Sequence, residues 1–362
     1  MNRHRVTRFA GAAIAGAALV FAATATAQEP LKIGFVYVSP IGDAGWTYQH
    51  DLARKEMEKA LGAKVQTKYV ENVPEGADAE RVIRELAASG SKLIFTTSFG
   101  YMNPTIKVAS QFPNVMFDHA TGYKTAKNVG VYNARFYEGR YLCGIIAGKM
   151  TKTNVAGYVA AFPIPEVVQG INAFTQGMRS VNPNAEVKVI WVNSWFDPGR
   201  EREAANTLMS QGADMLTHHT DSTAVVQAAE EKGKNSFGYH SDMSKYGPKT
   251  QLTATTHQWG AFYTKTANDV IAGKWKPENI WGGIKDGMIK LAPLNPAVPK
   301  DVGDMVAQAQ KDIVDGKLHP FQGPLKDNTG KERVPAGKAM TDDEMQKMDF
   351  YVAGVQGSLP KK

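Results

Sequence analysis

Aromatic and acidic residues follow several short apolar runs in this sequence, and they are the first candidates for chemistry. Apolar runs bounded by turn residues are typical of buried parallel strands, and open α/β sheets bind ligands beyond the carboxyl ends of their strands. Rings at those positions can stack on a flat ligand, while carboxylates, hydroxyls and imidazoles can hydrogen-bond to its edges. The candidate binding residues are Trp46, Thr47, Phe99, Asp118, Trp195, His218, His240, Asp242 and Trp259.

Some of these residues suit structural roles equally well. Trp46 lies on the apolar stripe of an expected helix, so it also suits the core. Asp43 and Asp197 each precede an expected helix and are more typical of caps than of ligand contacts. Asp242 equally suits a turn. Asp118 ends an apolar run, where an unpaired carboxylate would be costly, and this favours a partner from outside the strand.

Catalytic and metal-binding signatures are missing from the sequence. It contains no H-E-x-x-H, no G-x-S-x-G, no phosphate-binding P-loop and no G-x-G-x-x-G after the first strand. His218 and His219 are adjacent on an expected strand and must point to opposite faces, so they do not readily bind one ion. We therefore expect no enzyme activity, no cofactor and no metal site.

Strand-like and helix-like segments alternate from Leu31 onward, which predicts βαβ units and parallel sheets. The expected strands are 31–38, 64–70, 93–97, 115–118, 129–132, 155–160, 187–192, 215–218, 236–239 and 252–256. The expected helices are 43–61, 77–89, 138–150, 167–181, 199–211, 223–232 and 301–315.

Two similar α/β lobes follow from this pattern, with hinges near Asn133–Phe136 and Thr256–Gln258. We expect the first lobe to span residues 28–133 and to be rejoined by about 258–292, and the second to span 134–257. The segment 293–362, which is rich in Pro and Gly, is expected to wrap across both lobes.

The first 27 residues have the pattern of a secretory leader, with three arginines, an Ala-rich apolar run and Ala25-Thr26-Ala27 as the cleavage site. No Cys lies near that site, so we expect a free periplasmic protein and no lipid anchor. Without the leader arginines the formal charge falls from +7 to +4. The charges are dispersed, which argues against a nucleic-acid partner. The single cysteine, Cys143, excludes an internal disulfide framework.

The sequence resembles the Bmp (basic membrane protein) family of solute-binding proteins of ABC transporters, which includes purine-nucleoside-binding lipoproteins. The resemblance runs through most of the chain from Ile41 onward. It is carried by residues 41–46, 117–118, 128–131, 138–148, 170–183, 194–198, 211–214 and 238–242.

The resemblance implies a type I periplasmic-binding-protein fold, with two Rossmann-like lobes, three hinge crossings and a central ligand cleft. It implies a purine held between Trp46 of one lobe and Trp195 of the other. It also implies that Asp118 reads the donor edge of the base, and that an inner-membrane ABC permease and its ATPase are the partners.

Two departures from the family pattern favour a free purine base, adenine first, over a nucleoside. His240 replaces a common acid of the ribose site, which leaves Asp242 as the match to its aspartate, and Trp259 adds bulk where the sugar would lie. The alternatives are a purine nucleoside receptor, or a receptor of this fold for a sugar or another small solute. A periplasmic nucleoside hydrolase and a sensor that docks a membrane kinase are further alternatives.

Overall fold

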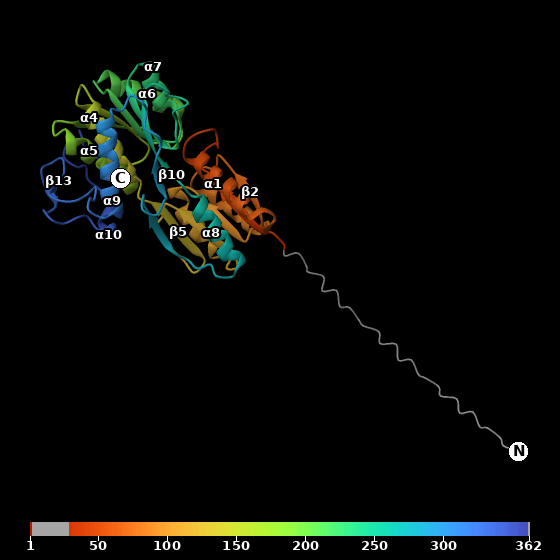
Figure 1. Cartoon of the computed structure of the whole chain (residues 1–362). Helices are drawn as coiled ribbons and strands as arrows, with labels where there is room; N and C mark the ends of the chain where they lie inside the picture. Colours follow the sequence, from red (N-terminus) through yellow and green to blue (C-terminus); the bar gives the residue numbers. More distant parts are fainter. Residues whose placement is uncertain (2–28, 361–362) are drawn as a thin grey trace.

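The computed structural model describes Met1 and residues 29–360, and the expected secretory leader lies outside the described residues. Two α/β lobes stand side by side, each built around one six-stranded sheet (Figure 1). The prediction of a two-lobed fold of the type I periplasmic-binding-protein class is confirmed. Within the described residues, no helix is both long and apolar enough to cross a membrane.

The first lobe contains a fully parallel sheet with the strand order β11-β5-β4-β3-β1-β2. Its strands are β1 (Leu31–Val36), β2 (Val65–Val70), β3 (Leu93–Thr96), β4 (Met116–Ala120), β5 (Val129–Ala134) and β11 (Asn279–Gly282). Its helices are α1 (Trp46–Leu61), α2 (Ala77–Ala88), α3 (Met102–Ala109) and α8 (Gly260–Ile271), with short 3₁₀ turns at Gly62–Lys64 and Phe99–Tyr101.

The second lobe contains a sheet of order β12-β10-β9-β8-β6-β7, in which only β12 runs antiparallel. Its strands are β6 (Val155–Ala160), β7 (Glu186–Trp191), β8 (Met215–His219), β9 (Asn235–His240), β10 (Gln251–His257) and β12 (Ile289–Leu291). Its helices are α4 (Phe136–Met150), α5 (Pro165–Val181), α6 (Pro198–Ser210) and α7 (Ala224–Glu231).

The chain passes between the lobes three times: between β5 and α4, between β10 and α8, and between β11 and β12. The expected boundaries near residues 133 and 257 lie in the first two connections. Arg135 joins the first connection to the third, because its backbone N–H donates to the carbonyl of Gly282 at 2.7 Å. Several short connections, in contrast to one flexible linker, suit a hinge that rotates the lobes as rigid bodies.

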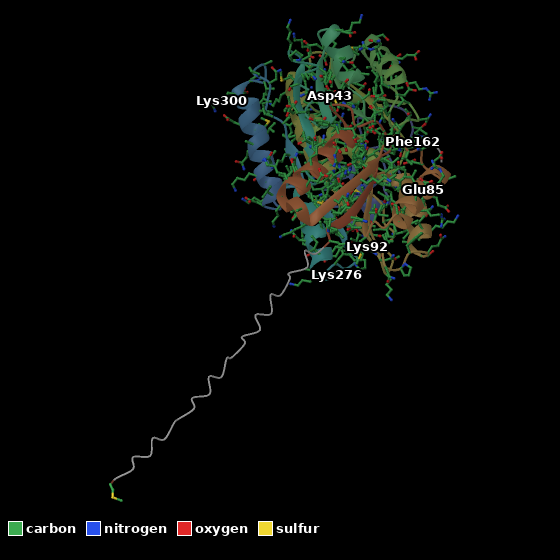
Figure 2. The ribbon with its side chains drawn as sticks, turned by 90° about the vertical axis from the view of Figure 1, so that its right-hand side faces the viewer. Asp43, Glu85, Lys92, Phe162, Lys276 and Lys300 are labelled. Carbon is green, nitrogen blue, oxygen red and sulfur yellow. The ribbon has the colours of Figure 1, made fainter. Side chains whose placement is uncertain are left out.

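The C-terminal segment packs on the second lobe, which corrects the expectation that residues 293–362 wrap across both lobes. It forms α9 (Lys300–Val314), β13 (Leu325–Lys326), β14 (Glu332–Val334) and α10 (Asp342–Gln346), and Lys300 marks the start of α9 at the outer edge of the molecule (Figure 2). Its buried side chains share one core with α4 and α5. Asn172 of α5 holds the chain end, since its side chain bonds the carbonyl of Phe350 and the N–H of Val352. The apolar faces of α4 and α5 therefore determine where the segment lies.

Two helix starts show how local sequence shapes the cleft. Asp197 caps α6 as expected: its side chain accepts from the N–H of Arg200 at 3.0 Å. Asp43 does not cap α1, because that helix begins only at Trp46. The Asp43 carboxylate instead binds the Lys245 ammonium and the Tyr246 hydroxyl of the second lobe, so it bridges the lobes.

Candidate functional site

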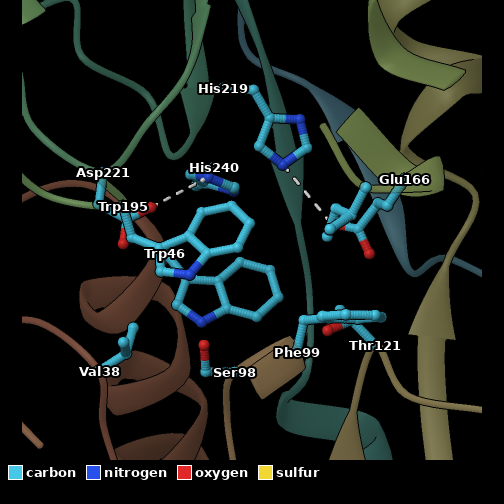
Figure 3. A pocket seen from close by; sticks show the side chains of 11 residues that line it. Val38, Trp46, Ser98, Phe99, Thr121, Glu166, Trp195, His219, Asp221 and His240 are labelled. Atoms are coloured by element: carbon cyan, nitrogen blue, oxygen red, sulfur yellow. Dashed lines mark ion pairs between the residues drawn. The ribbon is translucent and has the colours of Figure 1, made fainter. Parts of the chain in front are cut away.

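A cavity lies between the lobes (Figure 3). Ligand sites occur preferentially at such interfaces between domains. Most of its wall comes from residues at or just beyond the carboxyl ends of strands in both sheets. The lining residues are Val38, Trp46, Ser98, Phe99, Thr121, Ile164, Glu166, Trp195, His219, Asp221 and His240.

Each lobe contributes one tryptophan to the cavity. The Trp46 indole is 6% exposed, and its N–H donates to the carbonyl of Thr97 at 2.6 Å, which fixes the ring. The Trp195 ring packs edge-on against Phe162 at 5.0 Å, and its N–H donates to Glu75 of the first lobe at 3.1 Å. Trp46 and Trp195 do not form a stacked or edge-on pair with each other among the aromatic pairs of residues 29–360. The two indoles therefore offer separate surfaces to a flat ligand.

Two carboxyl groups of the second lobe each lie beside a histidine in the cavity (Figure 3). Asp221 is 3.4 Å from Nε2 of His240, and Glu166 is 3.5 Å from Nε2 of His219. Burial raises the pKa of Asp221 well above its usual range and raises the pKa of Glu166 to about 8. Burial also holds the pKa of both imidazoles well below the usual range. At neutral pH the histidines are therefore uncharged hydrogen-bonding groups.

The lobes touch tightly at Gly45, beside the cavity. Its N–H donates to the Ser241 hydroxyl of the other lobe at 2.8 Å. A Cβ at this position would lie 2.1 Å from the carbonyl oxygen of Asp221, and the φ angle of +98° also favours glycine. Only glycine allows this approach. Because the backbones of the two lobes meet directly here, the conformation described is a closed one.

Four of the residues predicted from the sequence line the cavity: Trp46, Phe99, Trp195 and His240. Thr47 lies one layer behind, where its hydroxyl pairs with that of Ser39 at 2.7 Å.

Asp118 does not line this cavity, so its assignment as the base-reading residue is wrong in this structure. Strand β4 continues to Ala120, and Thr121 is the residue that reaches the ligand cavity from this strand. Asp118 accepts a hydrogen bond from the Trp275 indole at 3.1 Å and lines a different cavity with Lys265. Burial raises the pKa of Asp118 to about 7. The expected strand end was two residues too early.

His218 also lies outside the cavity, although it was expected to line it. It points to the opposite face from His219, and its Nδ1 lies 3.1 Å from the carbonyl of Thr220. Strand alternation requires this arrangement. Of the two adjacent histidines, His219 is the one that faces the ligand.

Asp242 and Trp259 have structural roles in place of the expected contacts. Asp242 caps a turn, accepting from the Ser244 N–H at 2.9 Å and from the Gln251 amide at 2.8 Å. Trp259 is 1% exposed and stacks on His50, with its ring centroid 6.5 Å from that of Trp46. Trp259 therefore supports Trp46 from behind and does not fill the cavity.

Seven lining residues were not singled out from the sequence. Glu166 could have been found, because it follows the strand that ends at Ala160 within a Pro-rich loop, at a position where such sheets bind ligands. Val38, Ser98, Thr121 and Ile164 carry weaker signals, since small or apolar residues after a strand are common. His219 and Asp221 end and follow β8, so they carry the same positional signal as Glu166.

Comparison with known proteins identifies the family. Residues 31–318 match the Bmp family model, described as ABC transporter substrate-binding protein PnrA-like. The chain belongs to the Bmp family of ABC transporter substrate-binding proteins. It is 55% identical to a purine-binding protein of Brucella abortus over 95% of this chain and 98% of the relative. It is 40% identical to a putative ABC transporter glucose-binding protein of Haloferax volcanii, over 92% of this chain and 82% of the relative.

Solved structures share the fold at low sequence identity. A solute-binding protein of an ABC transporter from Aeropyrum pernix has a TM-score of 0.70 at 19% identity, over 84% of this chain and 95% of that one. A transcriptional activator of the comK gene from Bacillus halodurans has a TM-score of 0.68 at 24% identity, over 80% and 100%. The fold thus serves more than one role, and the cavity must decide the ligand.

Proposed function

We propose that this Bmp-family protein captures a purine in the periplasm and delivers it to an ABC permease and its ATPase. The cavity between the lobes supports this, because it combines one tryptophan from each lobe with two carboxyl–imidazole pairs. Stacking between a base and an aromatic side chain contributes about 1–3 kcal/mol per contact, and the paired groups supply donors and acceptors for the base edges. The 55% identical purine-binding relative supports the same ligand class.

A free base, adenine first, is favoured over a nucleoside. Asp242, the expected partner of a ribose, is committed to its turn. Trp259 does not take up the space of a ribose, because that ring lies behind Trp46. Capture then requires only hinge closure, with the closed form stabilised by a ligand that bridges both lobes.

A sugar is the second candidate. The 40% identical relative is a putative glucose-binding protein, and paired tryptophans with buried carboxyl groups also suit a sugar ring. The two candidates differ in the groups they present, because a purine offers flat faces and ring nitrogens whereas a sugar offers hydroxyl groups.

Calorimetric titration of the mature protein, unfolded and refolded to remove bound ligand, tests the proposal. The panel contains adenine, hypoxanthine, guanine, adenosine and glucose. We expect adenine to bind most tightly and glucose not to bind. Tighter adenosine binding would assign a nucleoside receptor, and heat from glucose alone would overturn the purine proposal. Chromatography of the adenosine sample tests the hydrolase alternative, which requires free adenine to accumulate.

A further inference from the structure

Glu166 is the cavity residue whose chemistry is least explained by the fold. It lies in the first turn of α5, its side chain is 13% exposed, and it points toward the ligand space opposite Phe99 and Thr121 (Figure 3). Its Oε2 is buried without a hydrogen-bond partner, although buried polar atoms are nearly always paired. An unpaired oxygen at the wall of a ligand cavity indicates a partner that arrives with the ligand.

The groups around Glu166 do not supply a positive charge to pair with it. Among the described residues no lysine or arginine forms an ion pair with this carboxyl group, and the group within ion-pair distance is His219 on β8. The nearby cation, Arg140 of α4, is fully buried and lies with its guanidinium 3.3 Å from the Tyr239 ring centroid.

Arg140 helps to keep the neighbouring histidine uncharged. After burial, it is the next largest cause of the low pKa of His219. The remaining titratable groups that interact with Glu166 are the tyrosines of β6 and β9, Tyr158 and Tyr239.

The protonation state of Glu166 follows from these surroundings. Burial raises its pKa to about 8, and the nearby Asn133 side chain lowers it by less. The carboxyl group is therefore mostly protonated at neutral pH. A protonated carboxyl group carries one O–H donor and one carbonyl acceptor, whereas an ionised one only accepts.

We propose that Glu166 is the specificity-determining residue of the cavity and that it pairs, as a neutral carboxyl group, with a purine edge carrying one donor beside one acceptor. Adenine has such an edge, with its exocyclic amine beside a ring nitrogen, and hypoxanthine has one in its ring N–H beside a carbonyl. Two adjacent donors, as on guanine, would instead suit an ionised carboxylate. This inference rests on the proposed purine function.

Adenine affinity measured by calorimetry from pH 6 to pH 9 tests this assignment. The variants are Glu166→Gln, which keeps one donor and one acceptor at every pH, and Glu166→Ala, which keeps neither. Glu186→Gln, an exposed acid at the start of β7, is the matched control. Asp221→Asn is measured in parallel, because the second buried acid contributes a pH dependence of its own. Circular dichroism at each pH confirms that every variant is folded.

The readout is the dissociation constant of wild type divided by that of Glu166→Gln at each pH. Titration of adenine and of Asp221 affects both proteins equally, so it cancels in this ratio. About nine-tenths of Glu166 is protonated at pH 7 and about one-tenth at pH 9, so we expect the ratio to rise about tenfold. Glu166→Ala should bind adenine at least tenfold more weakly at pH 7, and Glu186→Gln should match wild type. A ratio that does not change with pH, or wild-type affinity in Glu166→Ala, would overturn the assignment while leaving the purine proposal intact. Absence of adenine binding by wild type would refute the purine proposal itself.

Discussion

Glu75 is expected to control how long the ligand stays bound, because it holds a cavity-lining tryptophan across the cleft. Its Oε1 accepts three hydrogen bonds: from the Ser98 hydroxyl at 2.5 Å, from the Gly100 N–H at 2.9 Å and from the Trp195 indole at 3.1 Å. The first two fix the carboxylate within the first lobe. The third reaches the second lobe and exists only while the cleft is closed.

The magnitude follows from the single bond that crosses the cleft. A hydrogen bond contributes about 0.5–1.5 kcal/mol net, and Glu75 is exposed to solvent, so we take about 1 kcal/mol. Losing this bond destabilises the closed form and should speed ligand release about fivefold. Glu75→Gln keeps an acceptor oxygen and should release ligand more slowly than Glu75→Ala.

Stopped-flow release of adenine, followed by tryptophan fluorescence, measures this effect. Glu71→Ala is the matched control: Glu71 is an exposed acid of the same loop, and it accepts only from the Ile41 N–H within the first lobe. The control should release ligand at the wild-type rate. Equal release rates in wild type and Glu75→Ala would refute the reasoning, because the Trp195–Glu75 bond would then contribute nothing to closure.

Three further predictions follow from the same geometry. Trp195→Ala should weaken adenine binding about 5- to 150-fold through lost stacking, measured by calorimetry, and unchanged affinity would remove this residue from the site. Asp118→Asn should leave adenine affinity unchanged. It should also raise the urea midpoint at pH 8. The raised pKa of Asp118 means that the wild-type protein loses stability as pH rises toward about 7, and the variant has no carboxyl group to ionise. Burial lowers the pKa of His119, His218 and His257 to about 3, so the contribution of each histidine is full above pH 6.5 and is lost as pH falls, while the raised pKa values of Asp118 and Glu166 act in the opposite sense. At pH 5 each histidine costs about 2 kcal/mol, so His218→Gln should lose less of its urea midpoint than wild type between pH 7 and pH 5, and equal losses would contradict this.

The core of the fold was predictable because most of its central strands are short, largely apolar and buried runs. All ten expected strands are present, with ends that differ by at most two residues. The missed strands are short and lie at sheet edges or in the C-terminal segment. Asn279–Gly282, for example, holds two apolar residues in four, and only its pairing with β5 makes it a strand. Tertiary contact determines such elements, and local sequence does not.

Two of the three missed helices, α3 and α8, were missed for a local reason. Helix α3 contains Pro104 in its first turn, where proline is tolerated although it suggests a break in a sequence. Helix α8 begins at Gly260 without a capping side chain, directly after the β10 crossing. In both cases the helix is stabilised by the sheet that it covers, so its start carries no strong signal.

Errors of one or two residues at strand ends account for the largest difference in the site. Because the expected β4 ended too early, Asp118 was chosen, whereas Thr121 lines the cavity. On β8 the wrong one of two alternating side chains was chosen: His218 was expected to face the cavity, but His219 does. Both carboxyl groups that line the cavity, Glu166 and Asp221, therefore belong to the second lobe.

The first lobe then supplies mainly Trp46, Phe99 and hydroxyl groups. Hydrogen-bonded recognition is therefore concentrated on one lobe, while the other closes an aromatic surface over the ligand. We expect a purine to be selected by the second lobe before the cleft closes, because its groups are positioned by α5 and by strand ends that belong to that lobe alone.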